Sequence, residues 1–210
     1  MSITIHTPRK LIEKHTELFA LALCLFFIGF LIGLQPEYGQ PIIEHAKQIE
    51  IEPTATFTNV RAIFINNGII SVVGWVGWFL TPVMGLDYFP PTIMIYSVGA
   101  AYGAVAGYVS AFQFLVTLVS FGVLEAVGLI FGFVAGMLFP KYVFMKLTGK
   151  NAAFSEYAGD MLTLMFYSAV ALLAGALFEA ILINPLLMVI GIIGGVVATF
   201  FFLKFALQKV

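Results

Sequence analysis

The chain has 210 residues, of which 61% are hydrophobic and only 10% are charged, and its mean hydropathy is +1.03. Soluble domains are typically about 45–50% apolar and about 25% charged, so a soluble core of this size has no room for so many apolar side chains. The formal net charge is −1, and no basic stripe interleaved with aromatic residues predicts a nucleic-acid partner. Composition therefore predicts an integral membrane protein with the lipid bilayer as its solvent.

Six apolar segments approach the length of about 20 residues that a bilayer-crossing helix needs. In chain order they are 18–34, 62–86, 92–111, 114–139, 161–183 and 186–203. The predicted fold class is all-α: a polytopic transmembrane helix bundle of about six spanning helices, forming a single domain over residues 1–210. Most of the links are short, which favours successive helices as antiparallel neighbours. Basic residues precede the first segment, as in a signal peptide, but no small-residue cleavage site follows, so we interpret it as a retained anchor.

The lysines and arginines indicate the orientation. Eight of the ten fall on one side of a six-span bundle, in three groups: Arg9, Lys10 and Lys14; Lys141, Lys146 and Lys150; Lys204 and Lys209. Only Lys47 and Arg61 fall on the other side. The positive-inside rule then predicts a multi-pass protein of the cell membrane with both termini in the cytoplasm.

The same orientation places the loop at about 35–60 outside the cell. Its stretch "QPIIEHAKQIEIEP" is compatible with an ordered connector or a short amphipathic helix at the membrane interface. A docking or lid role is the alternative.

Glycines recur every four residues in two of the predicted spans, which keeps them on one helix face. They are Gly99, Gly103 and Gly107 in the third span and Gly128, Gly132 and Gly136 in the fourth. Small faces let helix backbones approach closely in lipid, so these glycines predict a tightly packed bundle. A sliding or pore-lining surface is the alternative, and unpaired glycine faces on the third and sixth spans suggest a homodimer interface.

Glu125 lies in the middle of an apolar span, on the face of Gly128 and Gly132. A carboxylate near the centre of an inserted helix costs about 2.5–3.5 kcal/mol on the translocon scale, so we expect Glu125 to be protonated or bonded to an amide. Similar depth in the outer half of the bundle suggests a polar network of Asn66, Asn67, Glu125, Glu179 and Asn184. Such a network either clamps helices together or forms a site for an ion, a proton or a partner.

No catalytic, cofactor-binding or metal-binding residue is predicted. The histidines at positions 6, 15 and 45 lie outside the spans and are interpreted as surface residues, and the single Cys24 cannot form an internal disulfide. Motifs of hydrolases, zinc proteases and phosphate-binding loops are lacking in the sequence, so an enzyme is not expected.

Two segments resemble the stage II sporulation protein M family (DUF95), and the resemblance runs from about Leu18 to Phe205. "IFINNGIISVVGWVGW" is similar to the family's asparagine-containing second helix, and "FGVLEAVGLIFGFVAG" to its Pro-His-Gly-x-x-Glu segment. Gly122 and Glu125 match that segment, whereas its proline and histidine are replaced by Ser120 and Phe121. No role that needs the imidazole therefore carries over.

The resemblance implies a multispanning scaffold or assembly factor that recruits partner proteins, with no catalytic residue of its own. The alternative from the residues is a small membrane transporter, channel or transporter subunit with Glu125 and Glu179 in a polar path. Protein partners or a homo-oligomer are expected under either function, in addition to the bilayer.

Overall fold

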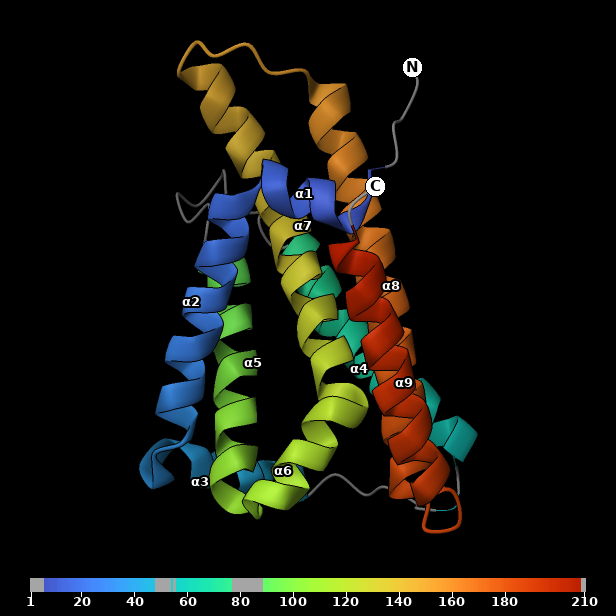
Figure 1. Ribbon diagram of the computed structural model, residues 1–210. Helices are drawn as coiled ribbons and strands as arrows, with labels where there is room; N and C mark the ends of the chain where they lie inside the picture. The colour runs from blue at the N-terminus through green and yellow to red at the C-terminus, as the bar shows by residue number, and fades with distance from the viewer. Residues whose placement is uncertain (1–5, 48–53, 55, 77–88, 209–210) are drawn as a thin grey trace.

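The computed structural model describes residues 6–47, 54, 56–76 and 89–208, and every regular element in these ranges is a helix (Figure 1). The shorter elements are α1 (Pro8–Lys14), α3 (Pro36–Lys47), α6 (Ala111–Thr117) and the π-helix η1 (Leu118–Gly122). The longer helices are α2 (Thr16–Gly33), α4 (Thr56–Val76), α5 (Phe89–Tyr108), α7 (Val123–Leu147), α8 (Phe154–Ile183) and α9 (Met188–Leu207). The all-helical prediction is confirmed for the described residues.

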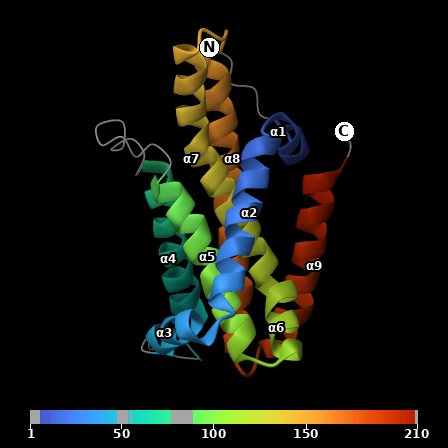
Figure 2. The ribbon, with the colours of Figure 1, turned by 90° about the vertical axis from the view of Figure 1, so that its left-hand side faces the viewer.

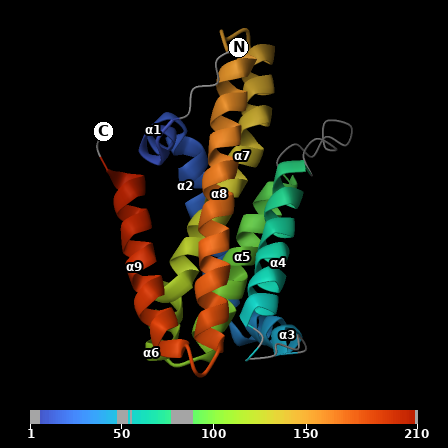
Figure 3. The same cartoon turned by 90° about the vertical axis from the view of Figure 1, so that its right-hand side faces the viewer.

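Four helical segments are long and apolar enough to cross a membrane: Thr16–Gly33, Ala111–Leu147, Phe154–Ile183 and Met188–Leu207. This supports a multi-pass membrane protein. Helices α4 and α5 run lengthwise in the same bundle (Figures 2 and 3) but are not among these four. Polar residues in α4 and tyrosines and glycines in α5 make both less apolar, and the predicted second span continues into 77–86, which lie outside the described residues. The count of six spans stays a prediction.

The start of α1, the end of α9 and the α7–α8 link lie at one end of the bundle, which we call the basic end (Figure 1). Arg9 Nη1 of α1 donates a hydrogen bond of 3.3 Å to the Leu207 carbonyl of α9. The described members of the three basic groups thus lie at one end, and Lys209 lies outside the described residues. Helices α3 and α6 and the α8–α9 link occupy the opposite end. Which end faces the cytoplasm stays a prediction.

Helices α2 and α5 are in backbone contact along a seam of glycines. A Cβ atom at Gly99 would overlap the Phe26 carbonyl oxygen, and one at Gly29 would overlap that of Tyr96. Only glycine permits this approach, which is the small-residue packing found between membrane helices. Helix α2 therefore packs along α5 rather than along α4, the next long helix in the chain, and the expectation that successive helices are neighbours is wrong here.

The glycine faces of the third and sixth predicted spans are covered within the chain. Gly99 and Gly103 pack on α2, and a Cβ atom at Gly195 of α9 would overlap the Ser120 carbonyl oxygen. The expectation of unpaired faces was therefore wrong. Gly107 has more room, since its nearest neighbour atom would lie 3.5 Å from an added Cβ.

In α7, a Cβ at Gly128 would come within 2.8 Å of Leu172 in α8, and Gly132 and Gly136 are buried.

Helices α6, η1 and α7 form one continuous helical segment from Ala111 to Leu147. A capping box of Ser110 and Gln113 starts it, with the Ser110 side chain accepting from the Gln113 amide. The π-helical turn at Leu118–Gly122 then interrupts the regular α-helix just before Glu125. Such turns are rare overall, but those that occur are often found at functional sites. This one therefore directs attention to the residues that follow it.

Candidate functional site

Two carboxyl groups meet inside the bundle, and we call Glu125 of α7 and Glu179 of α8 the acid pair. Gly175 of α8 packs against Glu125, and Glu179 follows one turn further along α8, close enough for the two carboxyl groups to interact electrostatically. Asn67 of α4 donates a hydrogen bond of 2.7 Å from Nδ2 to Glu125 Oε1. Three helices thus meet at Glu125, which is only 8% exposed.

Small residues make room for the acid pair. A Cβ atom at Gly175 of α8 would lie 2.5 Å from Glu125 Cγ, so the glycine leaves the space that this side chain fills. One turn further along α7, Ser168 Oγ of α8 donates a hydrogen bond of 2.7 Å to the Gly128 carbonyl oxygen. The glycines of α7 and α8 therefore position the carboxyl group as well as the helices.

The π-helical turn beside the acid pair is held by side chains from its surroundings. Tyr102 of α5 donates a hydrogen bond of 2.8 Å from its hydroxyl to the Gly122 carbonyl oxygen. Ser120 Oγ bonds the Val116 carbonyl within the segment at 2.6 Å. Carbonyl groups freed by the irregular turn thus find partners, as buried backbone groups require.

Two neighbouring carboxyl groups in an apolar bundle disfavour the state in which both are ionised, because their like charges repel. Two ionised carboxylates only accept hydrogen bonds, whereas a protonated carboxyl also donates one. The Asn67 amide supplies a donor to one Glu125 oxygen, and no cationic side chain contacts either glutamate among the described residues. Two neighbouring acids without a cation, inside an apolar bundle, therefore favour a state in which at least one carboxyl group is protonated.

The other two members of the predicted network lie elsewhere. Asn66 is exposed. Asn184 caps the end of α8, where the α8–α9 link begins. Asn184 Nδ2 donates to Thr56 Oγ1 at 2.8 Å, and its Oδ1 accepts from the Leu186 amide at 3.0 Å. The structure thus joins Asn67, Glu125 and Glu179, and separates them from Asn66 and Asn184. Depth along the helices could not distinguish Asn66 from Asn67, because adjacent residues of a helix point about 100° apart.

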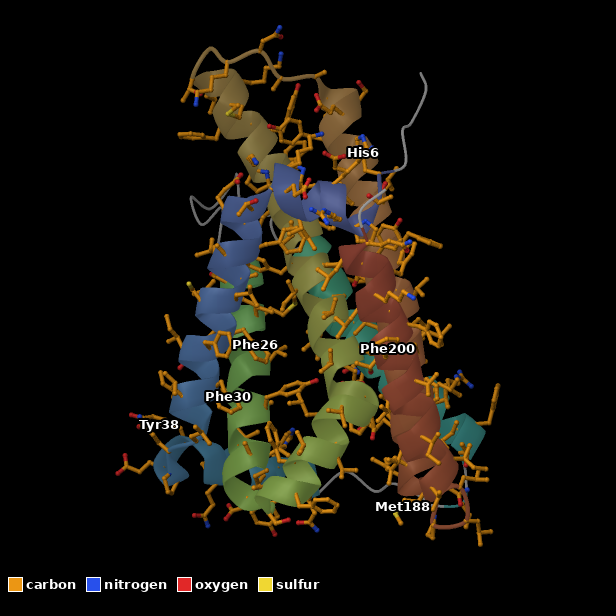
Figure 4. The ribbon with its side chains drawn as sticks, viewed as in Figure 1. His6, Phe26, Phe30, Tyr38, Met188 and Phe200 are labelled. Carbon is orange, nitrogen blue, oxygen red and sulfur yellow. The ribbon has the colours of Figure 1, made fainter. Side chains whose placement is uncertain are left out.

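A second buried carboxylate lies at the basic end and was missed in the sequence. Asp160 of α8 is 1% exposed. It is contacted by Lys14 Nζ at 2.6 Å, by His6 Nδ1 at 2.8 Å and by His15 Nε2 at 2.9 Å. Figure 4 shows His6 beside α8, near α1. We call these four residues the Asp160 cluster, and it fastens the N-terminal segment to α8.

The interpretation of the histidines as surface residues was wrong for His15, which is 1% exposed. Its Nδ1 lies 3.1 Å from Lys141 Nζ of α7, and Lys141 also pairs with Glu17 of α2. His15 therefore sits among charged groups from four helices. One signal was available, because "EKHTE" and "EYAGD" each place charged residues just before a span, at the same predicted end of the bundle.

The charge on Lys14 is stabilised by its partners. Burial alone would lower the pKa of its ammonium group, but hydrogen bonds and Coulombic attraction from Asp160 and Glu156 outweigh burial and raise that pKa above its ordinary value. Lys14 Nζ lies 2.7 Å from Glu156 as well as 2.6 Å from Asp160. The Asp160 cluster is thus an ion-pair network.

Among the described residues, no group of three or more His, Cys, Asp or Glu side chains is placed to hold a metal ion. Both Asp160 oxygens already accept from nitrogen donors.

Together, the apolar helices and their buried polar sites define an integral membrane helix bundle. Comparison with known proteins adds no closer identification, since no family model, curated protein or solved structure matches the chain.

Proposed function

We propose that this chain is a membrane transport protein, or a subunit of one, in which the acid pair carries a proton. The observation that carries the proposal is the packing of Glu125 against α8 at Gly175, one turn from Glu179, where Asn67 donates a hydrogen bond of 2.7 Å to Glu125. Ionisable residues are costly inside a membrane and commonly belong to substrate paths or proton relays. A carboxyl group can bind and release a proton, which is what a relay requires.

The surroundings of the acid pair favour proton transfer over a purely structural hydrogen bond between helices, which we call a clamp. A clamp needs one donor and one acceptor, which Asn67 and Glu125 already provide. Glu179 adds a second acid that the clamp does not require. The irregular turn at Leu118–Gly122 lies just before Glu125 and provides a place where the helix can change its register.

Proteoliposomes test the proposal directly. With a pH gradient and a pH-sensitive dye inside, the wild-type protein is expected to dissipate the gradient faster than empty vesicles. Glu125→Gln and Glu179→Gln should each abolish this activity, because an amide cannot release a proton. Glu156→Gln, which changes an exposed acid at the basic end, is the control and should behave as wild type. Wild-type vesicles that leak no faster than empty ones contradict the proposal.

A scaffold for partner proteins, as the resemblance to the stage II sporulation protein M family implies, is the second candidate. One feature favours it: the α7–α8 hairpin projects beyond α1 at the basic end (Figure 1). Its tip exposes Phe144, Leu147 and Phe154, and Leu147 is 82% exposed. Apolar side chains beyond the expected membrane boundary, beside Lys146 and Lys150, are suited to a protein contact.

Purification from native membranes tests the scaffold function. A protein that is recovered with the wild type should be lost with Leu147→Glu. It should be retained with Leu186→Glu, which alters an equally exposed leucine at the opposite end. Identical recovery with both variants contradicts a role for the hairpin.

A further inference from the structure

We propose that the end of the bundle opposite the basic end holds a binding pocket for an organic ammonium ion. A cavity of about 300 Å³ lies there between the end of α2, one face of α3 and the end of α5. It is separate from the acid pair and independent of the proposed proton transport. The residues that matter for its chemistry are Gly33, Leu34, Gln40, Glu44, Gly107 and Tyr108.

The charge around the cavity is negative. Among the described lining residues, Glu44 is the only ionisable acid or base apart from the Tyr108 phenol. The Glu44 carboxylate is exposed, and its one described hydrogen bond comes from Gln40 Nε2 to Oε1 at 3.0 Å. A carboxylate oxygen can accept more than one hydrogen bond, so Glu44 retains acceptor capacity for a ligand.

The carboxyl ends of two helices add to the negative electrostatic potential at the cavity. Helix α2 ends at Gly33 and α5 ends at Tyr108, and both residues line the cavity. The carboxyl end of a helix carries a partial negative charge of about half an elementary charge, because its last carbonyl groups lack partners within the helix. Two such ends beside one carboxylate favour a cation and disfavour an anion.

The N-terminus of α3, which carries a partial positive charge, does not cancel the negative potential from the ends of α2 and α5. Helix α3 begins at Pro36, which has no N–H group to offer. The next free donors, the amides of Tyr38 and Gly39, bond the Gln35 carbonyl oxygen at 3.1 and 2.9 Å. Two of the three N–H groups in this first turn are therefore occupied within the chain.

The location favours an organic cation over a small metal ion. Helix α3 lies across the end of the bundle (Figures 1 and 2), with Gly39 and Ile43 buried and Glu37 and Glu44 exposed. An amphipathic helix in this position is typical of the membrane interface. The Tyr108 ring at the wall of the cavity provides an aromatic surface that attracts ammonium groups. The cavity also exceeds the size of a bare ion, and Leu34 and Ile43 add apolar side chains to its lining.

Two sources of ammonium groups meet this description: a free amine from water and the headgroup of a phosphatidylethanolamine lipid. Calorimetric titration of the detergent-purified full chain with ethanolamine hydrochloride tests the shared chemistry. Saturable binding is expected for wild type. Glu44→Gln should weaken it by about tenfold or more, because it removes the charged partner of a hydrogen bond. Glu37→Gln, an exposed acid of the same helix outside the cavity, should bind as wild type.

A second variant fills the cavity without altering its charge. Gly107 has space for a side chain, since an added Cβ would be 3.5 Å or more from its neighbours. Gly107→Leu should abolish binding while the thermal unfolding of the protein remains close to that of wild type. If that variant does not fold, the comparison of Glu44→Gln with Glu37→Gln decides whether the pocket binds the ammonium ion.

Nanodiscs distinguish the two sources. If the ligand is a lipid headgroup, discs of phosphatidylethanolamine should block ethanolamine binding, and discs of phosphatidylglycerol should not. If it is a free amine, binding should be the same in both discs. Either result supports the ammonium site. The proposal is overturned if ethanolamine does not bind wild type in detergent or in phosphatidylglycerol discs, if Glu44→Gln binds as wild type, or if sodium acetate binds equally well.

Discussion

Asp160 and Glu125 are both buried carboxyl groups on helices that pack against each other, yet their partners are of opposite kinds. Asp160, at the basic end, is contacted by Lys14, His6 and His15. Glu125, inside the bundle, accepts a hydrogen bond from an amide and has a second acid, Glu179, nearby. A carboxylate among nitrogen donors is stabilised as an ion, whereas a carboxyl beside another acid needs a proton. The Asp160 cluster therefore fastens helices, whereas the proposed role of the acid pair is to bind and release a proton.

The largest loss of stability is expected from a change in the Asp160 cluster. Asp160→Asn keeps the shape of the side chain but removes the charge that Lys14, His6 and His15 surround. Breaking a buried ion pair from one side typically costs about 3–5 kcal/mol, and the low end of that range is expected because Lys14 and His6 are partly exposed. Unfolding in detergent measures the loss. Glu156→Gln, an exposed partner of the same lysine, is the control and should cost less than about 1 kcal/mol.

Gly175→Ala tests the space that the acid pair occupies. The added Cβ would lie 2.5 Å from Glu125 Cγ, so the glutamate must move or the helices must separate. Overpacking of this kind typically costs about 1–3 kcal/mol. Gly107→Ala is the matched control, since its Cβ would make ordinary contacts at 3.5–4.0 Å. Equal stability of the two variants in thermal unfolding contradicts the described packing of α7 on α8.

Lys14→Met tests the pH dependence of the Asp160 cluster. The pKa of Lys14 is raised in the folded protein by Asp160 and Glu156 in spite of burial. A raised pKa means that the ion pairs stabilise the fold fully below the ordinary lysine value of about 10.4 and that this contribution is lost as the pH rises further. The stability difference between wild type and Lys14→Met should therefore stay constant between about pH 8 and pH 10 and shrink above that range. A difference that grows with pH contradicts this assignment.

The smallest expected effect on stability is at Glu125 itself. Glu125→Gln keeps the shape and a hydrogen bond to Asn67, and interhelical hydrogen bonds in membranes average about 0.6 kcal/mol, so its cost should stay within about 1 kcal/mol. Glu125→Leu should cost more, because it leaves the Asn67 amide without its acceptor. Thermal unfolding of both variants in detergent makes the comparison. A Glu125→Gln variant that unfolds as readily as Glu125→Leu assigns the residue to assembly.

The sequence predicted the helical membrane class, since periodicity and apolar length are local properties. It also predicted that Glu125 lies on the glycine face of its helix, and the structure packs that face on α8, with Glu125 against Gly175. The partner helices could not be predicted in the same way. Contact of α2 with α5 depends on glycines 70 residues apart, and local patterns carry no information about such pairing.

The Asp160 cluster was not predicted for a related reason. His6, Lys14 and His15 lie about 150 residues from Asp160 in the chain, and each alone resembles a solvated charge near a helix end. Only the crossing of α1 over α8 brings them together and buries Asp160. The acid pair was easier to find, because a lone acid inside an apolar span is conspicuous wherever its partner lies.

Infrared spectroscopy of the purified protein at neutral pH tests the central claim most directly, since the carbonyl stretch of a protonated carboxyl is distinct from that of a carboxylate. Wild type is expected to show the band of a protonated carboxyl that is shielded from solvent. That band should be lost or shifted in both Glu125→Gln and Glu179→Gln, and should be unchanged in Asp160→Asn. A wild-type spectrum without a protonated carboxyl, or a band that only Asp160→Asn removes, would contradict a protonated carboxyl group in the acid pair.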